Sequence, residues 1–354
     1  MSIICFSSLK GGVGKTSLSI NVSHAFAERG CQTLLIDLDP VGHATRFFTP
    51  NVPFGRDGAD EPRAESPLAR LFLDRTLSVN GRGSLLHAAE QTNLSLVVPV
   101  RRRFDVLPTC PALRHFFWGK GAQSFREFFP RLIEELKDHY DHIVIDTSPD
   151  LNVITRNSIA LADIVAVPVD SSEMSIHCLE EVIAQTSHIK GATWSIVRTM
   201  VNKQASRVQE FVDTRIRRTL SLEKFENRPT AGENSEFNGN SDGLDFEDAS
   251  QFLWFLRKRE QELSKQNGTY RPQTPADPQP IYLLNSIVYR TEDQNKLSFV
   301  GRTAFDGRTT WKLADQYLHV ARELENIIAL RAHAPREDED LGEDLGYVQR
   351  LTAV

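Results

Sequence analysis

The chain has 354 residues, is 40% hydrophobic and 25% charged, and carries a formal net charge of −6. This length allows one large domain or two ordinary ones, and the composition is typical of a soluble globular protein with a sizeable core. The acidic balance gives no global signal for nucleic-acid binding, and no apolar run approaches the roughly 20 residues that a membrane span needs. The opening letters MSIICFSS do not resemble a signal peptide, so we expect a cytoplasmic protein.

Short apolar runs rich in β-branched residues alternate with helical patterns along the chain. In order, the predicted strands are 3–6, 33–39, 142–148, 163–170, 194–201 and 281–288. Helices are predicted at about 15–29, where the pattern stops at Gly30, and at about 311–333, while RRRF at 101–104 predicts a hairpin or loop tip. This alternation indicates an α/β fold with a mainly parallel, doubly wound sheet flanked by helices.

Three segments have the composition of additions to this core. Residues 49–67 are rich in proline, glycine and charge and predict a loop. Residues 204–280 predict an insertion in which a helix at 246–266 lies between two mobile linkers of low hydrophobicity. The aromatic side of that helix either packs on the sheet or forms a docking surface for a partner protein. We predict one domain over 1–333, followed by an acidic, solvated tail at 334–354.

The four cysteines are widely spaced and form no C-x-x-C pair. Cys5 and Cys31 lie in or beside apolar, strand-like runs, so we expect buried thiols in a reducing compartment. An iron–sulfur or zinc site would require closer spacing or additional histidines.

Residues 6–17, FSSLKGGVGKTS, match the end of a phosphate-binding P-loop but not its beginning. Gly14, Lys15 and Thr16 stand in the order that G-x-x-x-x-G-K-[ST] requires, whereas Leu9 occupies the position of its first glycine. Glycines let the backbone turn its N–H groups onto an anion, the lysine reaches the β and γ phosphates, and the hydroxyl can hold Mg²⁺. The run follows a predicted strand and opens a predicted helix, which is the context this motif needs.

Three aspartates close apolar strands on the same edge of the predicted sheet. Asp37 and Asp39 end one strand and Asp146 ends another, at the carboxyl edge where α/β sheets bind ligands. Any one of them alone could be an ordinary strand-end residue. Together with the P-loop they predict a nucleotide site, because carboxylates there hold the waters of Mg²⁺ and orient the attacking water.

These segments resemble ParA/MinD-type ATPases, which have a P-loop NTPase fold. KGGVGKT at 10–16, DLDPVGHAT at 37–45 and YDHIVIDTSPDL at 140–151 resemble the deviant Walker A, switch I and Walker B segments of that family. The stretches at 162–182 and 285–306 also resemble the family. The D-x-D-P-x-G-[NH]-A form of the switch is nearest the ParA branch, although this chain has valine where glutamine is usual.

The resemblance implies a homodimer that closes two ATP molecules, with Mg²⁺, between two copies of the chain. Lys10 would reach across to the phosphates bound by the other subunit. The less favoured alternative is that Lys10 is a solvated loop charge. The implied catalytic residues are Lys10, Lys15 and Asp39, and the implied Mg²⁺ residues are Thr16, Asp37 and Asp146. The implied nucleotide contacts are Lys10, Gly11, Gly12, Val13, Gly14, Lys15, Thr16, Ser17 and, for adenine, Asn202.

The cargo is less well defined by the sequence. Arg290 falls on an arginine that the ParA branch uses for nonspecific DNA, but acidic residues follow where a second arginine is usual. Arg215, Arg217 and Arg218 are further DNA candidates, and they could equally form the solvated face of a helix. The acidic tail argues against a membrane-binding role, which would need a basic amphipathic helix.

Three functional hypotheses remain open. The leading one is an ATP-hydrolysing dimeric switch that positions or partitions DNA or another cargo, slow alone and stimulated by a partner protein. The second is a nucleotide-gated regulatory or scaffold subunit with little DNA affinity. The third, a metabolic P-loop enzyme that uses ATP to activate a small substrate, does not explain Lys10 or the D-x-D-P switch.

Overall fold

The computed structural model describes residues 1–49, 96–117, 119–186, 188–189, 191–202, 206–219, 281–291, 297, 301–306 and 310–333. The predicted loop at 49–67, apart from Thr49, and the predicted helix at 246–266 lie outside these residues. So does the acidic tail.

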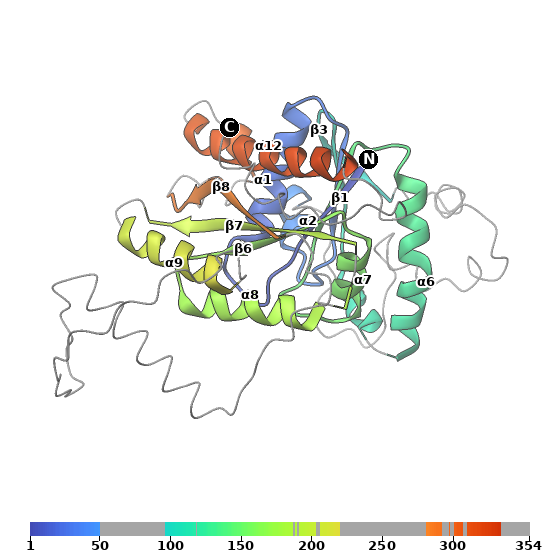
Figure 1. Ribbon diagram of the computed structural model, residues 1–354. Coiled ribbons are helices and arrows are strands. Elements are labelled where there is room, and N and C mark those ends of the chain that lie inside the picture. Colours follow the sequence, from blue (N-terminus) through green and yellow to red (C-terminus); the bar gives the residue numbers. More distant parts are fainter. Residues whose placement is uncertain are drawn as a thin grey trace, which may run out of the picture.

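Eight strands form a single sheet in the order β3-β4-β2-β5-β1-β6-β7-β8 (Figure 1). Their bounds are β1 Ser2–Phe6, β2 Thr33–Asp37, β3 Val98–Arg101, β4 Phe104–Leu107, β5 His142–Asp146, β6 Ile164–Val169, β7 Thr193–Val201 and β8 Ile281–Tyr289. Neighbouring strands run parallel except for the hairpin of β3 and β4. The six strands predicted from the sequence are all present, and the RRRF segment turns between β3 and β4 as expected.

Helices cover both faces of the sheet, which confirms the predicted doubly wound α/β architecture (Figure 1). On one face α12 packs on α1 and β8; on the other α6 packs on α7, and α8 lies against β6 and α9. Their bounds are α1 Lys15–Glu28, α2 His43–Phe48, α6 Gly119–Leu136, α7 Val153–Leu161, α8 Glu173–Thr186, α9 Ser206–Thr219 and α12 Trp311–His333. Each helical layer is separated from the sheet by its own apolar core.

The two cores fix the central strands, and hence the loops that follow them. β1, β2 and β5 are buried along their whole length, because they are covered on both faces. Phe125 and Phe129 of α6 stack with ring centroids 4.7 Å apart in one core. Phe26 of α1 and Tyr317 of α12 are fully buried in the other. Burying one such side chain contributes roughly 1.5–3 kcal/mol.

Two strands end earlier than the sequence pattern suggests. β2 stops at Asp37 and β5 at Asp146, so the residues predicted to continue them leave the sheet at its carboxyl edge. Cys5 is buried as expected, but Cys31 is only partly buried, because it lies in the turn between α1 and β2.

Within the described residues, no helix combines the length and apolar character needed to cross a bilayer.

Candidate active site

The loop between β1 and α1 has the backbone of an anion-binding turn. Gly12 and Gly14 have φ of 79° and 84°, in the left-handed region that favours glycine, and Gly14 is the N-cap of α1. The carbonyl of Val13, which is buried, accepts a hydrogen bond from Thr199 Oγ1 at 2.7 Å. This bond ties the loop to β7, and the N–H groups of the first turn of α1 remain available for an anion.

Lys15 extends from the first residue of α1 to the end of β5. Its Nζ donates to Asp146 Oδ1 at 3.2 Å and to the carbonyl of Thr147. Both members of the pair are buried, since 7% of the Lys15 side chain and none of the Asp146 side chain is exposed. Among the described residues, the other oxygen of Asp146, Oδ2, has no hydrogen-bond partner.

Asp37 lies beside Asp146, because the two residues are partners in the register of β2 and β5. Asp37 Oδ1 accepts from the N–H of Asp39 at 3.1 Å, and Oδ2 accepts from the N–H and the hydroxyl of Thr45, both at 2.8 Å. Burial, followed by the neighbouring Asp146 carboxylate, raises the pKa of Asp37 to about 7 despite these hydrogen bonds. Asp37 therefore anchors the start of α2 and also places a second carboxyl group beside Asp146.

Asp39 occupies the turn that follows β2. Its Oδ1 accepts from the N–H of Val41 at 2.9 Å, and its carbonyl accepts from the N–H of Gly42 at 2.8 Å. Gly42 has φ of 68°, so the turn uses a left-handed residue to enter α2. Asp39 is 6% exposed and is thus held at the carboxyl edge near the P-loop, and not in bulk solvent.

Lys10 is bound within its own chain, at the end of a different strand from the one that Lys15 contacts. Its Nζ donates to the carboxylate of Asp170, just after β6, and to Ser172 Oγ at 2.7 Å. This pair is only partly buried, with 22% of the Lys10 side chain and 19% of the Asp170 side chain exposed. Burial alone would raise the pKa of Asp170, but hydrogen bonds from Lys10 and Ser172 hold it below its usual value.

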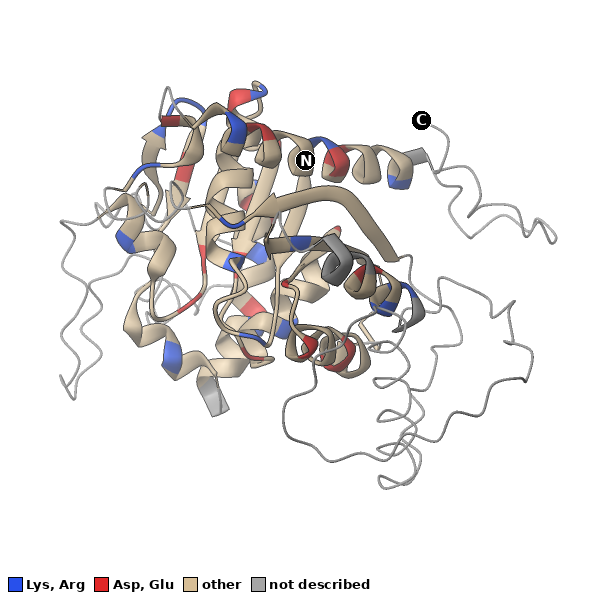
Figure 2. Ribbon diagram, turned by 90° about the vertical axis from the view of Figure 1, so that its left-hand side faces the viewer, with Lys and Arg blue, Asp and Glu red and all other residues tan. Residues whose placement is uncertain are grey.

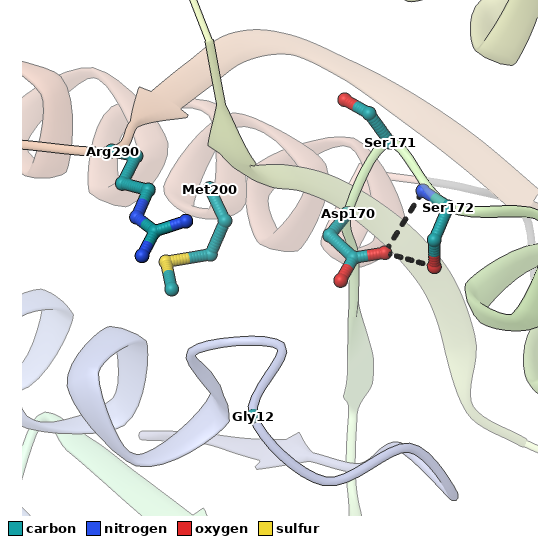
Figure 3. Close-up of a pocket in the computed structure, with 6 residues that line it drawn as sticks. All are labelled: Gly12, Asp170, Ser171, Ser172, Met200 and Arg290. Atoms are coloured by element: carbon teal, nitrogen blue, oxygen red, sulfur yellow. Dashed lines mark hydrogen bonds between the residues drawn. The ribbon is translucent and has the colours of Figure 1, made fainter.

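A pocket of about 450 Å³ is lined by Gly12 of the P-loop, by Asp170, Ser171 and Ser172 after β6, and by Met200 and Arg290. In Figure 3, Arg290 and Met200 approach it from one side and the Asp170–Ser172 turn from the other, while Gly12 of the loop lies below. Arg290 follows β8 and is exposed. Among the residues that line the pocket, it is the one that carries a guanidinium group. Asp170 was not among the predicted site residues, although a carboxylate that closes a parallel strand is the signal that identified Asp146.

The remaining predicted residues lie in three places. Thr16 and Ser17 are partly buried in the first turn of α1, and Asn202 is exposed at the end of β7. Arg215 and Arg217 lie on α9, which packs on α8, and Arg218 belongs to the same helix. In the view of Figure 2, basic and acidic segments are interspersed along the described elements.

The donors at this edge of the sheet fit a hard divalent cation. The side chains of Thr16, Asp37 and Asp146 offer only oxygen atoms, the ligand type that Mg²⁺ prefers. The unpartnered, fully buried Oδ2 of Asp146 supports this fit, because a buried carboxylate oxygen is costly unless a hydrogen-bond donor or cation satisfies it. A bound cation would also relieve the repulsion between the Asp37 and Asp146 carboxylates, which adds to the effect of burial in raising the pKa of Asp37.

Comparisons with known proteins agree with this geometry. A family model described as an AAA domain matches residues 1–198. The chromosome partitioning protein ParA of Myxococcus xanthus is 30% identical over 180 residues, 51% of this chain and 56% of that protein. The sporulation initiation inhibitor protein Soj of Bacillus subtilis is 28% identical over 182 residues, 51% of this chain and 63% of that protein. The chain thus spans less than two thirds of the length of these two relatives.

Solved structures share the architecture. Apo McdA of Cyanothece has a TM-score of 0.56 at 15% identity, with 92% of this chain and 99% of McdA covered. A plasmid partition protein of Borrelia burgdorferi B31 bound to AMPPNP has a TM-score of 0.51 at 17% identity, with 93% of this chain and 99% of that protein covered. At these identities the likeness concerns the fold, and it confirms the sheet flanked by helices that the sequence predicts.

Proposed function

Because this chain belongs to the AAA domain family and is a P-loop ATPase of the ParA/MinD type, we propose that it is an ATP-driven dimerising switch. In this proposal two copies of the chain close around two ATP molecules, and hydrolysis to ADP and phosphate opens them. The observation that carries the proposal is the buried Lys15–Asp146 pair, with an unsatisfied carboxylate oxygen, directly beneath an anion-binding turn.

The residues of the turn have separate roles in binding ATP. The loop from Gly11 to Gly14 surrounds the phosphates with backbone N–H groups, and Ser17 contacts the α-phosphate. Lys15 leaves the Thr147 carbonyl to contact the β and γ phosphates while staying near Asp146. Asn202, exposed at the end of β7, is our candidate adenine contact.

The acidic residues serve the metal and the water. Thr16 and Asp146 would hold Mg²⁺ with its waters, and the ion when bound neutralises charge on the transferred phosphoryl group. Asp37 supports that shell while it keeps the Asp39 turn in place through Thr45. Asp39 orients the attacking water, a positioning role that contributes to catalysis without covalent chemistry.

Lys10 gives the proposal its two-fold symmetry. A cation that reaches the phosphates of the partner subunit stabilises a closed, water-poor site that contains two highly charged ligands. Lys10 would have to leave Asp170 to do so. Completion of the site by dimerisation explains why hydrolysis would be slow alone and responsive to a partner protein.

The Asp39→Ala variant tests the switch. We expect it to bind ATP, hydrolyse it at least about 100-fold more slowly, and stay dimeric, as measured by multi-angle light scattering with ATP and with ADP. Asp138→Asn, at an exposed position of the α6–β5 turn, is the matched control and should behave as the wild type. Monomeric Asp39→Ala in saturating ATP would overturn the dimeric switch.

The proposal leaves two classes of biological role open: positioning of DNA, and nucleotide-gated regulation without DNA binding. The family relation favours the first. If the dimer positions DNA, nonspecific DNA should bind in ATP, and affinity should fall steeply between two salt concentrations. Arg290→Ala or Arg215→Ala together with Arg217→Ala should reduce the salt slope. Binding that is absent, or unchanged by ATP, would favour the second class, a nucleotide-gated regulatory or scaffold subunit in the cytoplasm.

A further inference from the structure

At the edge of the sheet opposite the P-loop, three residues with metal-binding side chains meet. The Cys31 sulfur, a His142 ring nitrogen and a Glu325 carboxylate oxygen all lie within 4.8 Å of one another. Cys31 lies in the turn before β2, His142 begins β5, and Glu325 lies on α12. We propose that Cys31, His142 and Glu325 bind one Zn²⁺, with water as the fourth ligand.

The register of the sheet brings the first two residues together. Thr33 and His142 are partners in the pairing of β2 and β5, so the turn that carries Cys31 lies against the start of β5. The carbonyl of Gln32 accepts from the N–H of His142 at 3.2 Å and from that of Asp141 at 2.8 Å, which fixes the turn there. The cysteine is therefore positioned by backbone structure and does not depend on a flexible loop.

His142 is oriented as a ligand would be. Its Nδ1 is 2.7 Å from Ser2 Oγ, and its ring stacks on Phe26 with centroids 4.2 Å apart. When Nδ1 carries the proton, it donates a hydrogen bond to Ser2 Oγ, and Nε2 presents a lone pair towards Glu325. Metal-bound histidines are usually held by a hydrogen bond of this kind from the nitrogen that does not bind the metal. Burial lowers the pKa of His142, which favours the neutral imidazole that metals bind.

The gap between His142 and Glu325 suits a cation better than a hydrogen bond. Nε2 of His142 and Oε1 of Glu325 are 3.9 Å apart, too far for a hydrogen bond. Nitrogen and oxygen ligands of a tetrahedral zinc ion lie roughly 3.4 Å apart, so about 0.5 Å of side-chain movement would close the site. Glu325 is partly exposed at the surface of α12, so the proposal assigns this movement to its side chain.

Arg29 competes for Glu325 but leaves one oxygen available. Its Nη2 and Nε donate to Oε2 at 2.6 and 3.0 Å, whereas the contact of Nε with Oε1, the oxygen that faces His142, is longer at 3.2 Å. Arg29 would then orient the carboxylate as an outer partner of the metal site. Its charge would lower the affinity for zinc below that of a four-ligand structural site.

The donors identify the metal. Sulfur, nitrogen and oxygen ligands together favour Zn²⁺ over Mg²⁺ or Ca²⁺, which prefer oxygen alone. Burial, followed by the negative charges of Glu325 and Asp141, raises the pKa of Cys31, and a bound cation would reverse that effect by stabilising the thiolate. Zinc there would tie α12 to the turn before β2 and to β5, independently of the nucleotide site.

The test measures zinc content and affinity on the full chain. Protein stripped with a chelator and reloaded with ZnCl₂ should retain about one zinc per chain after desalting. Cys31→Ser should lose at least about 100-fold in zinc affinity, measured by competition with a chromophoric chelator, while Cys110→Ser, which removes another partly buried thiol, should match the wild type. Cys31→Ser should bind ATP normally, which verifies its folding.

Two further measurements report on the ligand set. Co²⁺ in place of zinc should give thiolate-to-metal charge-transfer absorption in the wild type and in Cys110→Ser, but not in Cys31→Ser. Ser2→Ala should weaken zinc binding about tenfold through loss of the second hydrogen bond of His142. Wild-type protein that retains no zinc, or Cys31→Ser that binds zinc like Cys110→Ser, would overturn the proposal and leave an Arg29–Glu325 ion pair next to a thiol.

Discussion

The two lysines of the P-loop lie in different environments. Lys15 meets Asp146 and the Thr147 carbonyl in a buried pair, of which 7% and 0% of the side chains are exposed. Lys10 meets Asp170 and Ser172 in a pair of which 22% and 19% of the side chains are exposed. Both carboxylates lie at the carboxyl ends of buried parallel strands, but Asp146 is the last residue of β5, whereas Asp170 follows the end of β6.

The difference in burial predicts that the Lys15–Asp146 ion pair is permanent, whereas the Lys10–Asp170 ion pair can be exchanged. Breaking a buried ion pair by removing one partner costs about 3–5 kcal/mol, because the other charge stays buried. The Lys10–Asp170 pair is closer to solvent, and a fully exposed pair is worth only about 0–1 kcal/mol, so exchanging Asp170 for another anion should cost less. In the proposed switch, Lys15 would thus be a fixed part of the phosphate site, whereas Lys10 would leave Asp170 when the phosphates of a second subunit approach.

Replacement of Lys15 should have the largest effect and would sharpen the comparison from its buried side. We expect Lys15→Ala to lose at least about 100-fold in ATP affinity, measured with a fluorescent ATP analogue, because the negative charge of the ATP phosphates would no longer be paired with the Lys15 ammonium group. The variant should also be less stable to thermal unfolding, since Asp146 is left unpaired beside Asp37.

The matched control for this variant is Lys137→Ala, which removes an exposed lysine paired with Glu134 on the surface. It should bind ATP and unfold as the wild type does. Wild-type ATP affinity in Lys15→Ala would break the comparison, because both lysines would then be dispensable for the first nucleotide.

Replacement of Lys10 should separate dimerisation from binding. Lys10→Ala should retain ATP affinity within about threefold, yet weaken ATP-dependent dimerisation about 30-fold, measured by analytical ultracentrifugation over a range of protein concentrations. Its thermal stability should change little, because the ion pair it breaks is partly exposed. Normal dimerisation in this variant would mean that Lys10 serves only its own chain, through Asp170 and Ser172.

Most of the fold, and the positions of the strand-end aspartates Asp37 and Asp146, follow from local sequence patterns. β-branched runs identified the six long strands, and a carboxylate at a strand end identified Asp37 and Asp146, because parallel strands all end at one edge. β3 and β4 went unassigned, since VPVRRRFDVL interrupts short apolar runs with proline and arginine. Pro99 in β3 is compatible with its place at the edge of the sheet.

The contacts that local patterns could not supply join distant segments. Cys31, His142 and Glu325 meet only through the register of β2 and β5 and the packing of α12, so cysteine spacing argued against a metal site. The partner of Lys10 is likewise distant in sequence. Asp170 could have been named from its position at the end of a predicted strand, but its pairing with Lys10 depends on how β1 and β6 align.

The smallest expected effect comes from a change to the Lys10–Asp170 pair itself. Asp170→Asn removes the charge that holds Lys10 but keeps the shape of the side chain, so more molecules should present a free Lys10 to the partner subunit. If the pair is worth about 0.5–1 kcal/mol, each subunit gains about 2- to 5-fold, and the dimer dissociation constant in ATP should fall about tenfold. Asp138→Asn, which removes a charge on the exposed surface, should leave that constant unchanged. Weaker dimerisation in Asp170→Asn would show that Asp170 contributes to the closed dimer itself, and the distinction between a fixed Lys15 and a releasable Lys10 would then have to be abandoned.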